Sequence, residues 1–260
     1  MKQHIGYTSE KFTINIDETR IYKYTNDHTR IEFLKTQMSH LKKIGEKYPD
    51  TVPSNIQWED MSTAWGYSME YIKDANRIND SHLKNVIILI EHCSRILPKD
   101  SIPDFITFHS YIKDVLAKNA ELYVTEDFTY LINNFLTDLQ RLSSYFNEEK
   151  SSCHGDFTME NILVSGERIV VIDPIYKSEQ WSSWLQDIAK FYQNIYFSDV
   201  PKTLLFTEKI DLIAAGKSIP LYKMIHMLMI TNYIRMFPYI KDKPEIFVER
   251  YKEFKILIKE

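Results

Sequence analysis

The sequence predicts an α+β protein in which a short strand-rich segment precedes a longer, mostly helical region. Three observations support this class. Apolar residues alternate near the N-terminus as in strands, they recur at helical spacing through most of the remaining chain, and one apolar hairpin interrupts the helices. A length of 260 residues suits one large domain or two lobes.

Two short strands are expected at the N-terminus. Residues 12–16 alternate apolar and polar side chains, which is the period of a half-buried strand. Residues 17–19 offer a turn, and residues 21–24 follow as a second strand. The period of two puts Ile21 and Lys23 on the same face of that strand.

A helix is expected next, because apolar residues recur at helical spacing from residue 31 to residue 44. It opens at Asp27 or Thr29 and must stop before Pro49. A third extended stretch follows at residues 65–72.

Polar residues 73–76 mark the expected boundary between two lobes. The N-terminal lobe spans residues 1–73, and the C-terminal lobe spans residues 74–260. Three apolar stripes at helical spacing predict that the second lobe is mostly helical. They cover residues 83–97, 105–116 and 128–146.

One β-hairpin interrupts the helical lobe. Residues 162–164 and 169–172 form two apolar strands that are joined by a turn containing Gly166. Both outer ends of the hairpin carry polar residues, with Asn161 before the first strand and Asp173 after the second. A tight hairpin brings its outer ends together, so these two side chains are expected to be neighbours.

A third polar residue, Asp156, lies five residues before Asn161 on a loop that leads to the same end of the hairpin. Two carboxylates and an amide are hard oxygen ligands or proton acceptors, and they suit Mg²⁺ better than zinc. Phosphoryl transfer needs this combination, because one carboxylate orients the attacking hydroxyl while the other groups hold the metal on the phosphates.

Glycine is scarce, with six in 260 residues, about a third of the average usage of about 7%. The sequence contains neither the G-x-G-x-x-G fingerprint of dinucleotide-binding folds nor the Walker motif of P-loop proteins. The shortage excludes these glycine-rich phosphate cradles, and it leaves metal and carboxylate chemistry open.

The charge balance narrows the expected partners and location. A net charge of −4 argues against general nucleic-acid binding, although residues 176–260 carry 13 basic and 10 acidic side chains, a net charge of +3. Cys93 and Cys153 lack metal-ligand spacing, and the N-terminus lacks the apolar core of a signal peptide. The longest apolar run, residues 224–234, is too short to span a bilayer. A cytoplasmic protein without membrane insertion is expected, and its oligomeric state stays open.

The HGD motif at residues 154–156, Asn161 and the IDP motif at residues 172–174 resemble the aminoglycoside phosphotransferase and choline kinase family of small-molecule kinases. The resemblance implies a two-lobed protein-kinase-like fold, with a small antiparallel-sheet N-lobe that has one main helix and a larger helical C-lobe. It implies Asp156 as the catalytic base, and Asn161 and Asp173 as ligands of Mg²⁺.

The resemblance also implies the two substrates. ATP or GTP would donate the phosphate, and the acceptor would be a small metabolite such as a sugar, an amino alcohol or an aminoglycoside-like compound. Lys23 would hold the α- and β-phosphates, and Glu32 on the following helix would pair with that lysine. Residues 6–9 would form the loop that covers the phosphates.

The nucleotide base would bind beside the second strand and the hinge. Ile21 is placed to touch adenine, and residues 69–72 are similar to the hinge of the family, which makes Met69 and Tyr71 nucleotide-binding residues. His154 and Asp187 would brace the catalytic loop.

Two other classes of protein remain as alternatives. A nucleotide-binding pseudokinase or regulatory module is one, although the intact Asp156, Asn161 and Asp173 disfavour it. A protein kinase is less favoured, because Pro174 stands where a protein kinase has Phe-Gly and no Ala-Pro-Glu motif follows. Only thirteen residues separate Asp173 from Asp187, which leaves little room for an activation segment.

Overall fold

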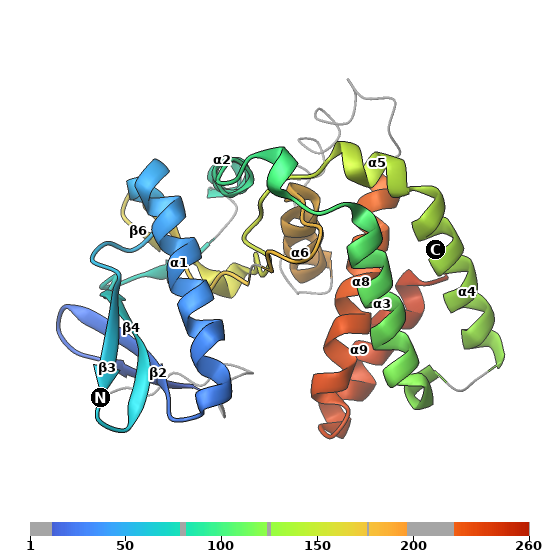
Figure 1. The fold of residues 1–260 in the computed structure, drawn as a ribbon, viewed down its shortest axis with the longest axis horizontal. Coiled ribbons are helices and arrows are strands. Elements are labelled where there is room, and N and C mark those ends of the chain that lie inside the picture. Colours follow the sequence, from blue (N-terminus) through green and yellow to red (C-terminus); the bar gives the residue numbers. More distant parts are fainter. Residues whose placement is uncertain (1–11, 79–81, 124–125, 176, 197–220, 260) are drawn as a thin grey trace. The chain divides into compact units, whose positions relative to one another are not determined.

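The computed structural model describes residues 12–78, 82–123, 126–175, 177–196 and 221–259, and it divides into two compact units (Figure 1). Unit 1 comprises Met1–Ile96 and His154–Tyr176, and unit 2 comprises Leu97–Cys153 and Lys177–Glu260. Unit 1 therefore contains the hairpin as well as the N-terminal sheet. The boundaries of these units differ from the expected lobes, residues 1–73 and 74–260. The division into those two lobes stays a prediction.

Unit 1 begins with an antiparallel sheet of strand order β1-β2-β4-β3. The strands are β1 (Thr13–Ile16), β2 (Arg20–Thr25), β3 (Gln57–Met61) and β4 (Ala64–Glu70). The two N-terminal strands predicted from the alternation are confirmed as β1 and β2. The sequence pattern did not indicate β3, because this edge strand is exposed along much of its length and lacks an apolar face.

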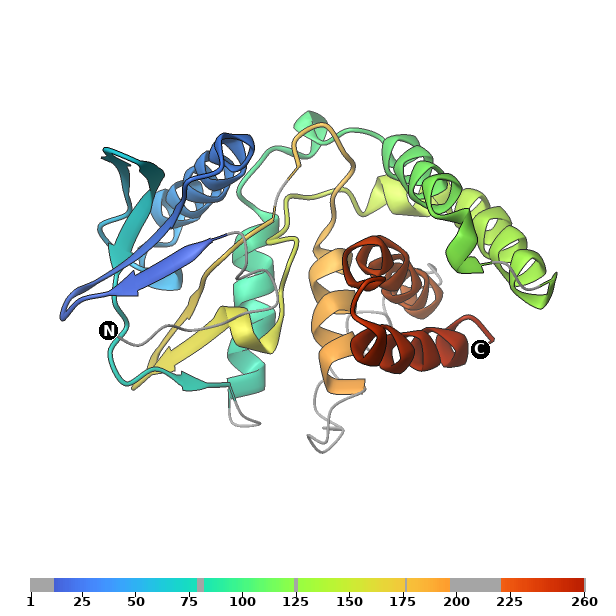
Figure 2. The ribbon, with the colours of Figure 1, turned by 90° about the horizontal axis from the view of Figure 1, so that it is seen from below.

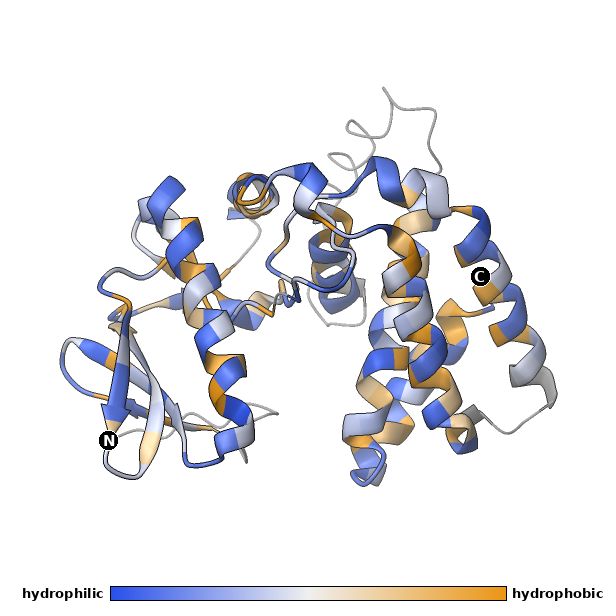
Figure 3. Ribbon diagram, in the orientation of Figure 1, coloured by the Kyte–Doolittle hydropathy of each residue, from blue (hydrophilic) through white to orange (hydrophobic). Residues whose placement is uncertain are grey.

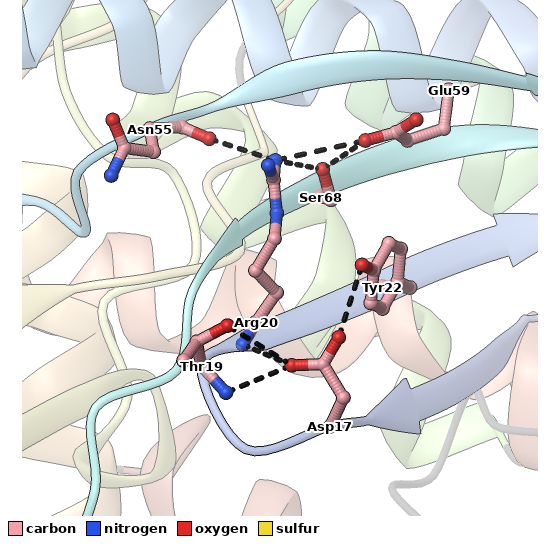
Figure 4. Close-up of polar contacts among 7 residues, drawn as sticks. All are labelled: Asp17, Thr19, Arg20, Tyr22, Asn55, Glu59 and Ser68. Atoms are coloured by element: carbon pink, nitrogen blue, oxygen red, sulfur yellow. Dashed lines mark hydrogen bonds and ion pairs between the residues drawn. The ribbon is translucent and has the colours of Figure 1, made fainter.

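The turn between β1 and β2 is fixed by one carboxylate, Asp17 (Figure 4). Its Oδ1 accepts the backbone N–H of Thr19 at 2.8 Å and that of Arg20 at 2.6 Å, while Tyr22 OH donates to Oδ2 at 3.1 Å. A short polar side chain that bonds the next backbone amides is the usual way to close such a turn.

Arg20 joins the other strands of the sheet to this turn (Figure 4). Its guanidinium donates to Asn55 O at 3.1 Å and to Ser68 Oγ, and it lies 3.6 Å from Glu59 Oε1. Ser68 Oγ in turn donates to Glu59. These contacts tie β2, β3 and β4 together, so they support the strand that carries Lys23.

Helix α1 (Ile31–Lys47) packs on this sheet. Asp27 caps the preceding 3-10 turn, where its Oδ1 accepts the N–H of Thr29 at 2.9 Å, and the helix ends before Pro49 as predicted. The α1 ribbon alternates between hydrophilic and hydrophobic colours along its length, as an amphipathic helix does (Figure 3).

A second sheet in unit 1 has the strand order β5-β6-β7. The strands are β5 (Asn76–Arg77), β6 (Ile162–Ser165) and β7 (Arg168–Val171). The hairpin predicted from the sequence is confirmed as β6 and β7, and Gly166 supplies the left-handed φ of +60° in its two-residue turn. Helix α2 (Leu83–Ser94) lies beside the hairpin (Figure 2).

Arg168 fastens this hairpin to the first sheet. Its Nη1 contacts both carboxylate oxygens of Glu70, at 2.8 and 3.0 Å, and its Nη2 donates to Val52 O at 2.8 Å. The Arg168 guanidinium holds the pKa of Glu70 below its usual range. The end of β4 and the start of β7 are therefore fixed to each other within unit 1.

Unit 2 is helical. Its helices are α3 (Phe105–Lys118), α4 (Glu126–Arg141), α5 (Ser143–Glu148), α6 (Trp184–Tyr196), α8 (Leu221–Ile240) and α9 (Pro244–Leu257). The stripe expected at residues 128–146 is divided between α4 and α5, because Leu142, with a ψ of 2°, leaves the helical range. None of the helices in the described residues is long and apolar enough to cross a membrane.

The centre of unit 2 is aromatic. Phe105 and Phe146 stack with ring centroids 4.2 Å apart, and Trp181 packs edge-on against both rings. Trp181 Nε1 donates to Phe146 O at 3.0 Å, so the polar end of the buried indole is satisfied. The aromatic residues around Trp181 therefore serve as core.

A buried polar cluster joins α8 to α9 in unit 2. Tyr233 OH donates to Glu253 Oε2 at 2.8 Å, and Arg250 Nη1 contacts both carboxylate oxygens, at 2.7 and 2.9 Å. Burial raises the pKa of the Tyr233 hydroxyl above its usual range, and the hydrogen bond to Glu253 raises it further. The phenol is therefore a neutral donor to a carboxylate that lies inside the fold.

Candidate active site

The predicted catalytic loop, residues 154–161, begins with a backbone turn that requires glycine. Gly155 has a φ of +82°, and a Cβ at this position would lie 1.7 Å from Ile175 O. The N–H of Ile175 donates to His154 O at 2.8 Å. The start of the loop therefore runs directly beside the chain that follows Asp173, and a larger residue than glycine would separate them.

Asn161 connects the end of this loop to its beginning. Its Nδ2 donates to Asp156 O at 2.8 Å and to Asp156 Oδ2 at 3.1 Å. The N–H of Ile172 donates to Asn161 O at 3.0 Å, so the outer ends of the hairpin meet. The structure thus brings Asp156 and Asn161 into direct contact, and it places Asn161 beside the residue that precedes Asp173.

Asp173 follows β7 in a left-handed backbone conformation, with a φ of +56°. Aspartate tolerates this region better than most residues, and strained backbone of this kind concentrates at functional sites. Its Oδ1 forms an ion pair with Lys23 Nζ at 2.9 Å and accepts a hydrogen bond from Tyr67 OH at 3.3 Å. The turn therefore directs the carboxylate at side chains of β2 and β4.

Burial sets the charge states of two residues around these carboxylates. It raises the pKa of the Tyr67 hydroxyl well above its usual range, and the Asp173 carboxylate raises it further, so Tyr67 is a neutral donor. Burial also lowers the pKa of His154, whose Nε2 lies 2.9 Å from Ile172 O. A neutral imidazole that donates to this carbonyl holds the start of the loop against the end of β7.

The prediction that Glu32 pairs with Lys23 is wrong. Glu32 lies on the outer side of α1, where its side chain is 82% exposed and pairs with Lys35 at 3.1 Å. Lys23 Nζ instead contacts Gln37 Oε1 at 3.0 Å, and Gln37 is only 3% exposed. Gln37 lies five positions after Glu32, which is about 140° around a helix, so the two side chains face different directions.

The residues expected to bind the nucleotide base lie on neighbouring strands. Ile21 and Met69 are directly paired across β2 and β4, and Met69 is buried. The N–H of Tyr71 already donates to Thr19 O at 2.8 Å, so a base bound beside Tyr71 would have to use other backbone groups. The phosphate-covering loop expected at residues 6–9 lies outside the described residues. The roles of Ile21, Met69 and Tyr71 stay predictions.

The residues present fit Mg²⁺. Because Asn161 turns its Nδ2 toward two oxygens of Asp156, its Oδ1 is the atom oriented to act as a ligand. Asp173 uses Oδ1 for Lys23 and Tyr67 and has Oδ2 as its second oxygen. One carboxylate and one amide oxygen together with substrate phosphates make the kind of donor set that Mg²⁺ accepts in nucleotide sites.

Gln37 and Tyr67 are residues of this site that the sequence interpretation missed. One feature of the sequence could have indicated Gln37. It is a polar residue at helical spacing from the apolar Leu34, Leu41 and Ile44, which are all buried on α1. A polar side chain on a buried helix face needs a partner, and a lysine on a nearby strand can supply it. Nothing in the sequence indicates a role for Tyr67, because tyrosine is common in strands.

Asp187 is fully buried on α6, in unit 2. Its expected contact with the catalytic loop stays a prediction.

Comparison with sequence families gives no match. No family model matches the chain, and no curated protein matches it.

Solved structures, in contrast, match nearly the whole chain. The choline kinase LicA from Streptococcus pneumoniae superimposes with a TM-score of 0.62 at 12% identity, over 99% of this chain and 93% of that one. A choline/ethanolamine kinase family protein from Mesorhizobium loti gives a TM-score of 0.62 at 14% identity, over 100% and 88%.

An aminoglycoside phosphotransferase, solved as a complex with GDP and kanamycin, gives a TM-score of 0.68 at 9% identity, over 98% of this chain and 91% of that one. At these identities the likeness concerns the fold. The resemblance found in the catalytic-loop motifs is therefore confirmed at that level, and the chain has the kinase-like fold of choline kinases and aminoglycoside phosphotransferases.

Proposed function

We propose that this protein is a kinase that transfers the γ-phosphate of ATP or GTP to a hydroxyl of a small polar metabolite. One observation carries the proposal. Unit 1 holds Asp156 against Asn161 through two hydrogen bonds, and it holds Asp173 against Lys23 at 2.9 Å. A base, a metal-binding pair and a phosphate-binding lysine are the parts that phosphoryl transfer requires.

Each residue has a distinct role in the proposed reaction. Asp156 accepts the proton of the acceptor hydroxyl, and its contact with Asn161 fixes the direction of that carboxylate. Lys23 binds the α- and β-phosphates. Asn161 and Asp173 would hold Mg²⁺, which supplies neutralisation of the phosphate charge when bound. Most of the rate in such reactions comes from positioning and charge stabilisation.

The fold comparisons support the nucleotide and the small acceptor. LicA has been solved in complex with AMP, and the aminoglycoside phosphotransferase with GDP and kanamycin. Adenine and guanine nucleotides both occur among these similar structures, so ATP and GTP are both retained as donors. The proposed setting is the cytoplasm, where both nucleotides are available.

The acceptor is proposed by class. Sugars, amino alcohols and aminoglycoside-like compounds all present the hydroxyl that the reaction needs. The net charge of +3 on residues 176–260 favours a polar acceptor of low positive charge over a polycation.

A nucleotide-binding pseudokinase or regulatory module is the second candidate function. It is favoured by one observation, the replacement of the expected Lys23–Glu32 ion pair by a contact with Gln37. Nucleotide binding does not distinguish the two functions, since both require it. Phosphate transfer does.

The test is a panel of hydroxylated metabolites scored for consumption of ATP and of GTP with Mg²⁺. We expect transfer to at least one acceptor class, and a loss of about 10²- to 10⁴-fold in Asp156→Ala, because a general base contributes that much. Asp50→Ala, a change at an exposed position, is the matched control and should retain the rate. Equal turnover by the wild type and a folded Asp156→Ala variant would refute the assignment of Asp156 as the base.

A further inference from the structure

Tyr67 brings a buried hydroxyl to Asp173 from the interior of the first sheet. The residue is 1% exposed, and its OH donates to Asp173 Oδ1 at 3.3 Å. A buried tyrosine hydroxyl needs a hydrogen-bond partner, and Asp173 is its one partner within the described residues. Strand β4, which carries Tyr67, pairs with β2 along one edge and with β3 along the other. The hydroxyl is therefore held by a strand that is fixed on both sides.

Asp173 Oδ1 has a second partner, Lys23, which differs from Tyr67 in charge and in flexibility. Lys23 Nζ lies 2.9 Å from this oxygen, at the end of a flexible four-carbon chain. Its positive charge repels a cation that approaches the same carboxylate, whereas the neutral hydroxyl of Tyr67 does not. In the proposed reaction the donors of Lys23 are also shared with the phosphates. Tyr67 is therefore the partner of Asp173 that competes with neither the metal nor the nucleotide.

We propose that Tyr67 is a positioning residue for Asp173, because its hydroxyl holds Oδ1 and thereby keeps the second carboxylate oxygen available to Mg²⁺. This inference rests on the proposed function, in which Asp173 is a metal ligand. Asp173 lies after the end of β7, in a left-handed backbone with a φ of +56°, so no strand pairing fixes its side chain. Hydrogen bonds to a metal-binding carboxylate orient it, and they raise its affinity for the metal.

Removal of the hydroxyl should weaken Mg²⁺ binding and leave metal-free nucleotide binding unchanged. Tyr67→Phe keeps the ring and deletes the hydrogen bond, while Lys23 still contacts Asp173 Oδ1 in the unliganded protein. We expect the Mg²⁺ concentration that gives half-maximal nucleotide affinity to rise about tenfold, since the loss of such a partner costs about 10- to 100-fold in metal affinity. A role limited to packing would instead change nucleotide affinity equally with and without Mg²⁺.

Isothermal titration with a non-hydrolysable analogue of ATP or GTP measures both affinities without using turnover. It is carried out at a series of free Mg²⁺ concentrations and in excess chelator. Tyr24→Phe is the matched control, because it deletes a tyrosine hydroxyl that accepts a hydrogen bond from Asn15 Nδ2 at 2.8 Å in the same sheet. The period of two puts Tyr24 on the face of β2 opposite to Lys23. The Mg²⁺ dependence of this control should stay within twofold of the wild type.

A second variant keeps the test decisive if Tyr67→Phe fails to fold. Tyr67→Met also lacks the hydroxyl, its flexible side chain can fill the space of the ring, and it should show the same shift. An unchanged or lower Mg²⁺ requirement in either folded variant would overturn the inference, and so would an equal loss of nucleotide affinity with and without Mg²⁺. Failure of the wild type itself to bind either nucleotide in a Mg²⁺-dependent manner would instead refute the proposed function.

Discussion

The two units each contain a buried cluster of ionisable side chains, and the clusters differ in how they are built. In unit 2, Tyr233, Arg250 and Glu253 come from two consecutive helices, and Arg250 reaches Glu253 one turn along α9. In unit 1, Lys23 and Asp173 are 150 residues apart in sequence, and the aspartate has a left-handed backbone. The first cluster is local and closed, whereas the second is assembled from distant segments and includes strain.

We propose that this difference separates a stabilising cluster from a ligand-binding one. The Glu253 carboxylate, 11% exposed, is surrounded by donors of its own unit, so it has no evident need of a ligand. The Asp173 carboxylate is 29% exposed and has its second oxygen available for a cation. Changes in the unit 2 cluster should therefore alter stability, and changes in the unit 1 cluster should alter ligand binding.

The largest effect is expected at Gly155, where the backbone leaves no room for a side chain. Gly155→Ala places a Cβ against Ile175 O and forces an alanine into a left-handed conformation, so it should destabilise the protein by more than about 2 kcal/mol. Chemical denaturation of the two proteins measures the difference. A stability equal to that of the wild type would mean that the loop does not need the backbone geometry described above.

The second effect concerns ligand binding in unit 1. Lys23→Met should weaken binding of the Mg²⁺–nucleotide complex by about 10- to 100-fold, because a charge-assisted contact with the phosphates is lost. Titration calorimetry gives the affinity. Lys43→Met, at an exposed position of α1, is the control and should change it less than twofold. If both variants bind alike, another cation holds the phosphates.

The third prediction concerns the unit 2 cluster, where a change should lower stability and leave nucleotide affinity unchanged. Tyr233→Phe removes the hydroxyl that donates to the buried Glu253, which should cost about 1–3 kcal/mol of stability. Denaturation measures this loss, and nucleotide affinity at 15 °C should stay unchanged. A variant of normal stability with altered nucleotide affinity would erase the distinction between the two clusters.

The smallest effect is expected at the half-exposed link between the two sheets of unit 1. Arg168→Gln should lower stability by less than about 1 kcal/mol at pH 7, as is usual for such pairs. Because Arg168 depresses the pKa of Glu70 in the folded state, the pair stabilises the fold at pH values above the ordinary pKa of 4.5. That stabilisation is lost as the pH falls through the depressed pKa.

Stability curves of Arg168→Gln and the wild type between pH 7 and pH 3 test this sign. The two curves should converge on acidification. A gap that widens toward low pH would show that Arg168 acts through a group other than Glu70.

The elements that local patterns describe were predictable from the sequence. Strands β1 and β2, helix α1 and the β6–β7 hairpin follow from alternation, helical spacing and turn residues. Strand β3 was missed, because its mostly exposed side chains carry no apolar period. The partner of Lys23 was assigned to Glu32 by resemblance, but the orientation of α1 puts Gln37 on the buried face.

The contact of Lys23 with Asp173 shows why the site was only partly predictable. Spacing within residues 154–174 indicated the group of Asp156, Asn161 and Asp173, because a hairpin joins its own ends. No local pattern shows which strand of the first sheet faces Asp173. That depends on the packing of the two sheets within unit 1, to which the Arg168–Glu70 link contributes.

The most direct test of the account is nucleotide binding by Asp173→Asn and by Glu253→Gln, measured by calorimetry with Mg²⁺ and with excess chelator. The wild type and Glu253→Gln should both bind nucleotide in a Mg²⁺-dependent manner. Asp173→Asn should lose the Mg²⁺-dependent part of the affinity while remaining folded. Mg²⁺-dependent binding of wild-type strength in Asp173→Asn would contradict the assignment of the unit 1 cluster as the nucleotide and metal site.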